Sequence, residues 1–466
     1  MKKATKNQWI AFSIVAALYI LFIIWVGNYW WLLGLAVIFD IYISKLVPWG
    51  AWKNPKDKSL KKIAEWVDAI VFALVAVYFI NLFIFQMYKI PTSSLEKSLL
   101  VGDYLMVNKF SYGPRIPNTP LSFPLVQHTL PVINTKSYIE WPRWDYKRLK
   151  GLGNVKRNDI VVFNYPAGDT VALNSPSNQD YYYSVRQYGR ARVWSDKVIF
   201  GNIVYRPVDR RENYVKRCIG MPGDSLQIIK NEVYINGVHS PLPAKAQFNY
   251  IVETFGSYWN DRQFRTLGIS KDDSRNLLND NISFLEAVGI EKNPDGSFNP
   301  VYLLPLTQES LQKLEKSGWA RSIRIEPDDY FYNGDIYPYI ESFRWTRDNY
   351  GPIWIPQKGA TIELNKKNLA IYSRCIVAYE NNTLQTVDNV VMINNRPADT
   401  YTFKYDYYFM MGDNRHKSQD SRSWGFVPED HIVGKPILIW LSTDKDRGIL
   451  SGGIRWKRIF KSPGKV

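Results

Sequence analysis

The chain is poor in cysteine and histidine, the residues that most often build metal sites, because its 466 residues include two cysteines and four histidines. Cys218 and Cys375 show no paired spacing, which excludes a zinc ribbon and a disulfide scaffold. The sequence does not decide whether they bridge each other, and two free, buried thiols are the simpler expectation. The histidines are His128, His239, His416 and His431. None lies in a nucleophile-elbow motif, so a Ser-His-Asp triad has little support.

Internal repeats and low-complexity tracts are also missing, and the length allows two or three domains. Aromatic residues are abundant instead, with 31 Tyr and 17 Trp, and they favour sheet in the soluble part of the chain. The net charge of +16 raises the question of nucleic-acid binding. The basic residues are scattered and lie beside apolar runs, however. Attraction to anionic membrane lipids therefore explains the charge without nucleic acid.

Three apolar runs, residues 9–26, 29–47 and 66–86, occupy the N-terminal region. The first is long enough to cross a hydrocarbon core of ~30 Å at a rise of ~1.5 Å per residue. A cleavable signal peptide is the competing interpretation, but no small-residue cleavage site follows and the second run begins at Tyr29. We therefore predict about three transmembrane helices.

The lysines around these runs predict the orientation. Three of them precede the first run, and five crowd the segment between the second and third: Lys2, Lys3 and Lys6, then Lys53, Lys56, Lys58, Lys61 and Lys62. The positive-inside rule places both segments in the cytoplasm, so the third run exports everything after about residue 87. The third helix keeps this orientation even if the second run does not span, because the lysine-rich segment still precedes it.

Beyond the membrane the sequence predicts short strands, at residues 103–107, 159–165, 214–218, 226–229, 233–235 and 407–411. Ser270 and Thr307 resemble N-caps before helical patterns at 271–280 and 308–317, which suggests an α/β insertion. The expected divisions are an anchor (1–87), a β core in two parts (88–249 and 401–440), an insertion (250–400) and a basic C-terminal tail (441–466).

Three sequence blocks carry the chemistry. They are Ile90–Leu95 with Leu100–Tyr104, then Tyr214–Asp224, and then Gly412–Arg415 continuing through Ser418, Asp420, Ser421 and Arg422 to Trp424–Pro428. Asn158–Phe163 lies between the first two. In their order and their residues these blocks resemble those of the bacterial type I signal peptidases, also called leader peptidases. The resemblance covers about residues 66–240 and 400–440 but not the insertion, and it implies a mainly β catalytic core.

A serine hydroxyl needs a base before it can act as a nucleophile, and a lysine can be that base only when it is neutral. At pH 7 an unperturbed lysine is neutral in about one molecule in 2,500, and burial raises that fraction. Lys216 lies on a predicted strand between Val215 and Cys218. Taken alone it fits a solvated charge on an edge strand. Within its block, the resemblance favours the general base.

Two neighbouring serines compete for the role of nucleophile. The family pattern Ile-Pro-x-x-Ser selects Ser94 and leaves Ser93 as a spacer. The family usually continues with Met and then a Pro-Thr pair, where this chain has Leu95 and then Lys97-Ser98. Leucine preserves an apolar contact of similar volume. Loss of the proline is a departure that changes the turn.

The resemblance implies further roles. The N–H of Ser94, helped by Thr92, would form the oxyanion hole, Ser418 would orient the lysine, and Asp420 with Arg422 would form a structural ion pair. The substrates would be exported preproteins at the outer, periplasmic face of the bacterial cytoplasmic membrane. The protein-export translocase is a conceivable partner. A Ser/Lys dyad needs no metal, nucleotide or other cofactor.

Two alternatives belong to other classes of protein. Penicillin-binding proteins share short motifs that Ser94–Lys97, Ser274–Asn276 or Ser297–Asn299, and Lys316–Gly318 approximate, but the last ends a helical pattern where a strand is required. The altered turn after Leu95 also suits a catalytically impaired homologue that serves as a scaffold or chaperone. Residues 120–133, with Trp141 and Trp144, read either as ordinary loop packing or as a surface that dips into the membrane interface.

Overall fold

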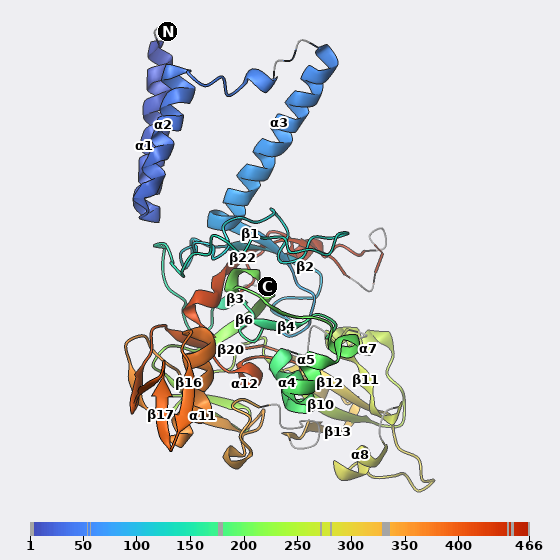
Figure 1. The fold of residues 1–466 in the computed structure, drawn as a ribbon. Helices are drawn as coiled ribbons and strands as arrows, with labels where there is room; N and C mark the ends of the chain where they lie inside the picture. The colour runs from blue at the N-terminus through green and yellow to red at the C-terminus, as the bar shows by residue number, and fades with distance from the viewer. Residues whose placement is uncertain are drawn as a thin grey trace. The chain divides into compact units, whose positions relative to one another are not determined.

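The computed structural model describes residues 4–53, 55, 57–175, 180–270, 273–279, 282–328, 336–444, 447–448 and 452–464. Two compact units divide the chain. The anchor unit comprises residues 1–86 and 109–154, and the catalytic unit comprises residues 87–108 and 155–466. Figure 1 shows helices dominating the first and strands the second. The fold is therefore mainly β beyond its N-terminal helices, as predicted.

The anchor unit contains two helices that are long and apolar enough to span a membrane, Lys6–Val26 and Ser59–Ile84. The first is α1, which begins with a capping box between Thr5 and Gln8. The second combines α3 (Lys58–Phe79) with the π-helical turn η4 (Ile80–Ile84). The residues of both helices are mostly exposed in the isolated chain, as lipid-facing residues would be.

The second apolar run forms a shorter helical stretch than the predicted 29–47. It comprises η1 (Tyr29–Leu32), α2 (Leu33–Phe39) and η2 (Asp40–Ser44), and it folds back along α1. The ring of Phe39 packs against those of Trp9 and Phe12. The stretch ends at Ser44, and the chain that follows it is held by the Asp40 carboxylate, which accepts hydrogen bonds from the Leu46 and Val47 amides and from the Trp49 indole. Residues 29–44 are therefore not among the helices of spanning length.

The segment 109–154 belongs to the anchor unit although it lies beyond the helices in sequence. Tyr78 Oη donates to Pro120 O at 2.6 Å, and Lys147 Nζ donates to Val26 O at 2.8 Å. The Trp25 ring stacks on Phe110 at 5.4 Å. Residues 120–133 thus touch the helix ends at Pro120. Most of their large apolar side chains are exposed, however: Leu121, Phe123, Leu125, Val132 and Ile133.

A seven-stranded sheet forms the core of the catalytic unit, in the order β1-β2-β22-β3-β6-β20-β21. Its strands are Phe85–Lys89, Asp103–Asn108, Ile432–Ser442, Ile160–Asn164, Asn213–Gly220, Tyr407–Met411 and Val427–Pro428. A second sheet contains the predicted hairpin of β7 (Ser225–Ile229) and β8 (Glu232–Ile235), joined through Lys230 and Asn231, with β9 (Val238–Ser240) and β14 (Tyr350–Trp354). Positive φ at both turn residues matches a tight hairpin.

The insertion has a sheet and a core of its own. The strand order is β11-β12-β10-β13, with bounds Arg275–Asn276, Val301–Thr307, Gln247–Thr254 and Ala320–Ile325. Its helices are α7 (Asp261–Thr266), α8 (Ile282–Ala287) and α9 (Gln308–Ser317). The α9 helix and its Thr307 cap confirm the prediction. The predicted helix at 271–280 is wrong for the described residues 273–279, where Arg275 and Asn276 pair with β12.

The remaining elements are smaller. Residues 180–200 form the short helices α4 (Tyr181–Tyr188), α5 (Arg190–Ser195) and α6 (Lys197–Phe200), beside the pair β4 (Thr170–Ala172) and β5 (Ile203–Tyr205). Later in the chain come β15 (Thr361–Glu363), α11 (Lys366–Arg374), β16 (Leu384–Val387), β17 (Val390–Ile393), β18 (Arg396–Pro397), β19 (Thr400–Thr402) and α12 (Ser421–Trp424).

The structure also bears on two further predictions, the state of the two cysteines and the C-terminal tail. Cys218 and Cys375 are free and buried, as the sequence suggested. The expected C-terminal tail begins inside β22, and its later part packs on the core. Arg458 pairs with the buried Asp103 at 2.7 Å, and Phe460 N donates to Ile439 O at 2.7 Å.

Candidate active site

Lys216 lies in the middle of β6, a strand with partners on both edges. It faces Val161 of β3, and the next residue pairs with Met411 of β20. The Lys216 side chain is buried, and its Nζ donates a hydrogen bond to Ser94 Oγ at 2.5 Å. Ser94 is also buried. The two residues that sequence reasoning proposed as base and nucleophile are therefore in direct contact.

Burial controls the charge of Lys216. Desolvation lowers the pKa of its ammonium to about 8, while the carboxylates of Asp420 and Asp413 oppose this shift. With a pKa of about 8, about one lysine in ten is neutral at pH 7, against about one in 2,500 for a free side chain. Removal of the lysine from water thus makes it a usable base near neutral pH.

Ser94 lies in a turn that belongs to no helix or strand. Its carbonyl accepts a hydrogen bond from Asn414 N at 3.1 Å, and the Asn414 amide donates to Ser93 O at 3.3 Å. The turn closes on itself where Leu99 N donates to Leu95 O at 2.7 Å. Both leucines are buried, so the Leu95 that replaces the family methionine keeps an apolar contact.

An ion pair beside the turn, between the partly buried Arg217 and the buried Asp413, was missed by sequence reasoning. Arg217 binds Asp413 through both carboxylate oxygens, at 2.7 and 2.6 Å. Ser98 Oγ donates to Asp413 Oδ2 at 2.5 Å. All three residues lie in or beside the quoted blocks, but nothing in the sequence links Arg217 to a residue 196 positions away. The pair connects the lysine strand, the nucleophile turn and the 412–415 loop.

Asp420 and Arg422 form the predicted ion pair. The guanidinium binds the carboxylate through Nε at 2.9 Å and through Nη2 at 2.8 Å, and both side chains are buried. Asp420 Oδ2 also accepts a hydrogen bond from Gly412 N at 3.1 Å. Position 412 must be glycine, since a Cβ there would meet Ser418 Oγ at 2.2 Å and Ser94 O at 2.5 Å.

Ser418 and Thr92 are placed less tightly than the dyad. Ser418 Oγ is buried against Gly412, and it has no hydrogen-bond partner among the described residues. It does not bond Lys216 in this conformation. Thr92 is exposed two residues before the nucleophile. A hydroxyl buried without a partner costs free energy, so Ser418 is an exception to the usual pairing of buried polar groups.

The insertion reaches the nucleophile turn through Lys97. Its ammonium donates to Gly268 O, while its backbone has a φ of 71°. Proline cannot adopt that angle, so the family residue does not fit this turn in its present conformation. On the other side, Lys417 pairs with Asp273 of the insertion at 2.8 Å. The insertion thus contacts both the turn that contains Ser94 and the loop that follows Gly412.

The first strand of the insertion also bonds directly to the 412–415 loop. Gln247 N donates to Asp413 O, and Arg415 N donates to Gln247 O, each at 2.9 Å. The insertion therefore begins at the site, three residues before the predicted position 250. Burial lowers the pKa of the neighbouring Arg415 to about 10.

The competing motifs do not assemble. Lys97 donates to Gly268 O, and the lysine bonded to Ser94 is Lys216. Lys316 lies in the last turn of α9. Within the part of the chain that the structure describes, no group of three His, Cys, Asp or Glu side chains is placed to hold a metal ion.

A buried serine bonded to a buried lysine on a β scaffold defines a class of serine peptidase that uses lysine as its base. Comparison with known proteins agrees. The sequence matches the family "Signal peptidase, peptidase S26" over residues 63–336 and 355–441. The chain therefore belongs to the signal peptidase family, peptidase S26, and is a hydrolase of that class.

Curated relatives support the same assignment. The chain is 24% identical to "Signal peptidase I" of Buchnera aphidicola subsp. Acyrthosiphon pisum over 400 residues, 86% of this chain and 81% of that one. It is 21% identical to "Signal peptidase I" of Haemophilus influenzae over 411 residues, 88% and 78% of the two chains. A segment of 36 residues, 8% of this chain and 14% of the other, is 64% identical to "Signal peptidase I" of Aquifex aeolicus.

Proposed function

We propose that the protein is a membrane-bound serine endopeptidase that removes N-terminal signal peptides from exported preproteins, with Ser94 as nucleophile and Lys216 as general base. The observation that carries this proposal is the 2.5 Å hydrogen bond from Lys216 Nζ to Ser94 Oγ between two buried side chains. The family match supplies the class of substrate.

The reaction proceeds through an acyl-enzyme. Neutral Lys216 takes the proton of Ser94 Oγ as that oxygen attacks the scissile carbonyl carbon. The tetrahedral intermediate collapses, the C–N bond breaks, and the lysine ammonium gives its proton to the departing amine of the mature protein. Lys216 then takes a proton from a water as the water oxygen attacks the ester carbon. The C–O bond to Ser94 breaks as that proton passes to Ser94 Oγ, which restores the serine and releases the signal peptide with a free carboxylate.

The neighbouring residues act in support. The Ser94 N–H makes no hydrogen bond within the described chain, so it is available to an oxyanion, with Thr92 as a second donor. Ser418 orients the amine of Lys216. Asp420 and Arg422 hold Gly412 against the Ser94 carbonyl. The dyad itself uses no metal or cofactor.

The apolar helices and the family together make this a membrane-anchored enzyme. We place it in the bacterial cytoplasmic membrane, with several spans and the catalytic unit on the periplasmic side, because lysines crowd the N-terminal ends of α1 and α3 and the residues just before them. Ser94 follows Phe85 by nine residues, which spans at most ~30 Å. Exported preproteins, membrane lipids and the export translocase are then within its reach, and nucleic acid has no role.

The test is cleavage of a preprotein by the purified full chain in detergent. The substrate carries Ala-x-Ala at the end of its signal peptide. We expect cleavage by the wild type, and loss of cleavage in Ser94→Ala and in Lys216→Ala, with Ser93→Ala as the matched control that still cleaves. A scaffold or chaperone would bind the preprotein without cutting it. Cleavage that persists in both dyad variants overturns the mechanism.

A further inference from the structure

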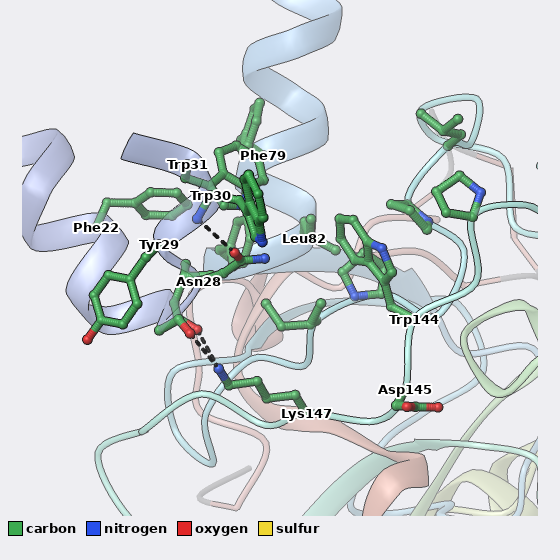
Figure 2. A pocket seen from close by; sticks show the side chains of 18 of the residues that line it. Phe22, Asn28, Tyr29, Trp30, Trp31, Phe79, Leu82, Trp144, Asp145 and Lys147 are labelled. Atoms are coloured by element: carbon green, nitrogen blue, oxygen red, sulfur yellow. Dashed lines mark hydrogen bonds between the residues drawn. The ribbon is translucent and has the colours of Figure 1, made fainter. Parts of the chain in front are cut away.

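A cavity of about 830 Å³ lies within the anchor unit. Its walls come from the ends of α1 and α3, from η1 and from the 116–147 segment, all of which belong to that unit. Figure 2 shows Phe22, Trp31, Phe79 and Leu82 around it. Apolar side chains dominate the lining, so the cavity suits a hydrocarbon ligand.

The cavity is bounded by the helices that are apolar enough to span a membrane, and by the last turns of both. The aromatic residues Tyr29 and Trp30 at its edge are 70% and 81% exposed. Trp144 lines the opposite side from the 116–147 segment. Tryptophan and tyrosine gather where helices leave the hydrocarbon for the head-group layer. The lining and its aromatic edge therefore suit lipid better than water.

A cation stands at the polar side of the cavity. Lys147 Nζ donates to Val26 O at 2.8 Å and to Gly27 O at 3.3 Å, as the dashed lines in Figure 2 show. An ammonium group has three donors, so one remains for a ligand. The stretch around it carries four basic residues and one acid: Arg143, Lys147, Arg148 and Lys150, with Asp145. Of these, Lys147 and Asp145 line the cavity, so an anionic group would have to lie at the Lys147 end, beside Val26 and Gly27.

We propose that the cavity is a binding site for one membrane phospholipid, with an acyl chain in the apolar space and the phosphate at Lys147. A free phosphate ion would leave the apolar walls unused. The apolar segment of a signal peptide would fill them, but signal peptides carry positive charge in their polar region and offer nothing anionic to Lys147. The combination of hydrocarbon walls, an aromatic edge and an ammonium selects a phospholipid.

The experiment uses the full chain in vesicles of phosphatidylcholine that contain some phosphatidylglycerol with a diazirine at the end of one acyl chain. After irradiation, adducts are mapped by mass spectrometry. We expect them to concentrate on cavity residues such as Phe79 and Leu82. Leu82→Trp should fill the cavity and remove most of that labelling. Leu18→Trp is the control, because Leu18 is 63% exposed on α1 and does not line the cavity.

The head-group contact is tested separately. Lys147→Gln should lower cavity labelling about fivefold, the effect expected of one lysine near an anionic surface, and Lys150→Gln should leave it unchanged. Thermal unfolding of each variant, followed by circular dichroism, shows that it folds. Three results overturn the proposal: labelling spread evenly along the exposed faces of α1 and α3, labelling displaced by inorganic phosphate, or labelling displaced by a preprotein that itself crosslinks to the cavity.

Discussion

Lys216 and Ser94 share one hydrogen bond, yet the backbone on its two sides is held in different ways. Lys216 belongs to a strand paired on both edges, with β3 and with β20. Ser94 belongs to a turn whose position depends on the 412–417 loop and on the insertion. Lys216 is thus fixed by regular sheet hydrogen bonds, and Ser94 by contacts between segments that are far apart in sequence.

The difference has a consequence for evolution of the site. The lysine strand can keep its place whatever the insertion becomes, because its partners are core strands. The serine turn cannot, since Gln247 of β10 bonds to both Asp413 and Arg415 in the loop that holds Ser94 O. Change in the insertion should therefore alter activity through the serine side of the dyad. The four predictions below test this asymmetry.

The largest effect is expected on the lysine side. Lys216→Met keeps the apolar packing of the buried stem but removes the base, so kcat/KM should fall by about 10²–10⁴-fold. The thermal unfolding temperature should not fall, because methionine has no charge to desolvate. Preprotein cleavage and circular dichroism are the measurements. A variant that keeps more than a tenth of the wild-type rate would mean that another group serves as base.

The second prediction breaks the connection between strand and turn. Arg217→Leu leaves the fully buried Asp413 without its partner, which should lower the free energy of unfolding by about 3–5 kcal/mol. Denaturant titration measures it. The double variant Arg217→Leu with Asp413→Asn should recover part of the loss, because the unpaired charge is gone. Equal losses in the single and double variants would show that the unpaired charge on Asp413 is not what destabilises the single variant.

The strand that carries Lys216 could be predicted from the sequence, whereas the contacts that hold the Ser94 turn could not. Alternating apolar residues and turn signals located β6 and β20, and a capping threonine located α9. Ser270 and Thr307 both look like N-caps in the sequence, but only Thr307 begins a helix. Ser270 Oγ donates to Asp273, and Arg275 and Asn276 pair with β12. The bonds of Asp413 and Gly268 join residues more than 150 positions apart, and local patterns carry no trace of them.

The third prediction concerns pH. Only neutral Lys216 can accept the serine proton, and burial lowers its pKa to about 8. Therefore kcat/KM should rise with pH and level off above about 8, where an unperturbed lysine would give a rise that continues to about 10. Burial also raises the pKa of Glu96, in the serine turn, to about 7. Glu96→Gln is thus the control, and the step near 8 should remain in it.

The smallest effect is expected where the insertion meets the serine turn. Lys97→Met removes the hydrogen bond to Gly268 O, and kcat should fall by between about twofold and tenfold while KM changes little. Lys97→Arg keeps a donor and should retain most of the activity. Lys97→Pro restores the family residue but cannot adopt a φ of 71°, so it should reduce kcat more than the methionine does. If proline instead raised activity, the turn would have to relax to another conformation, and the insertion would not be what positions Ser94.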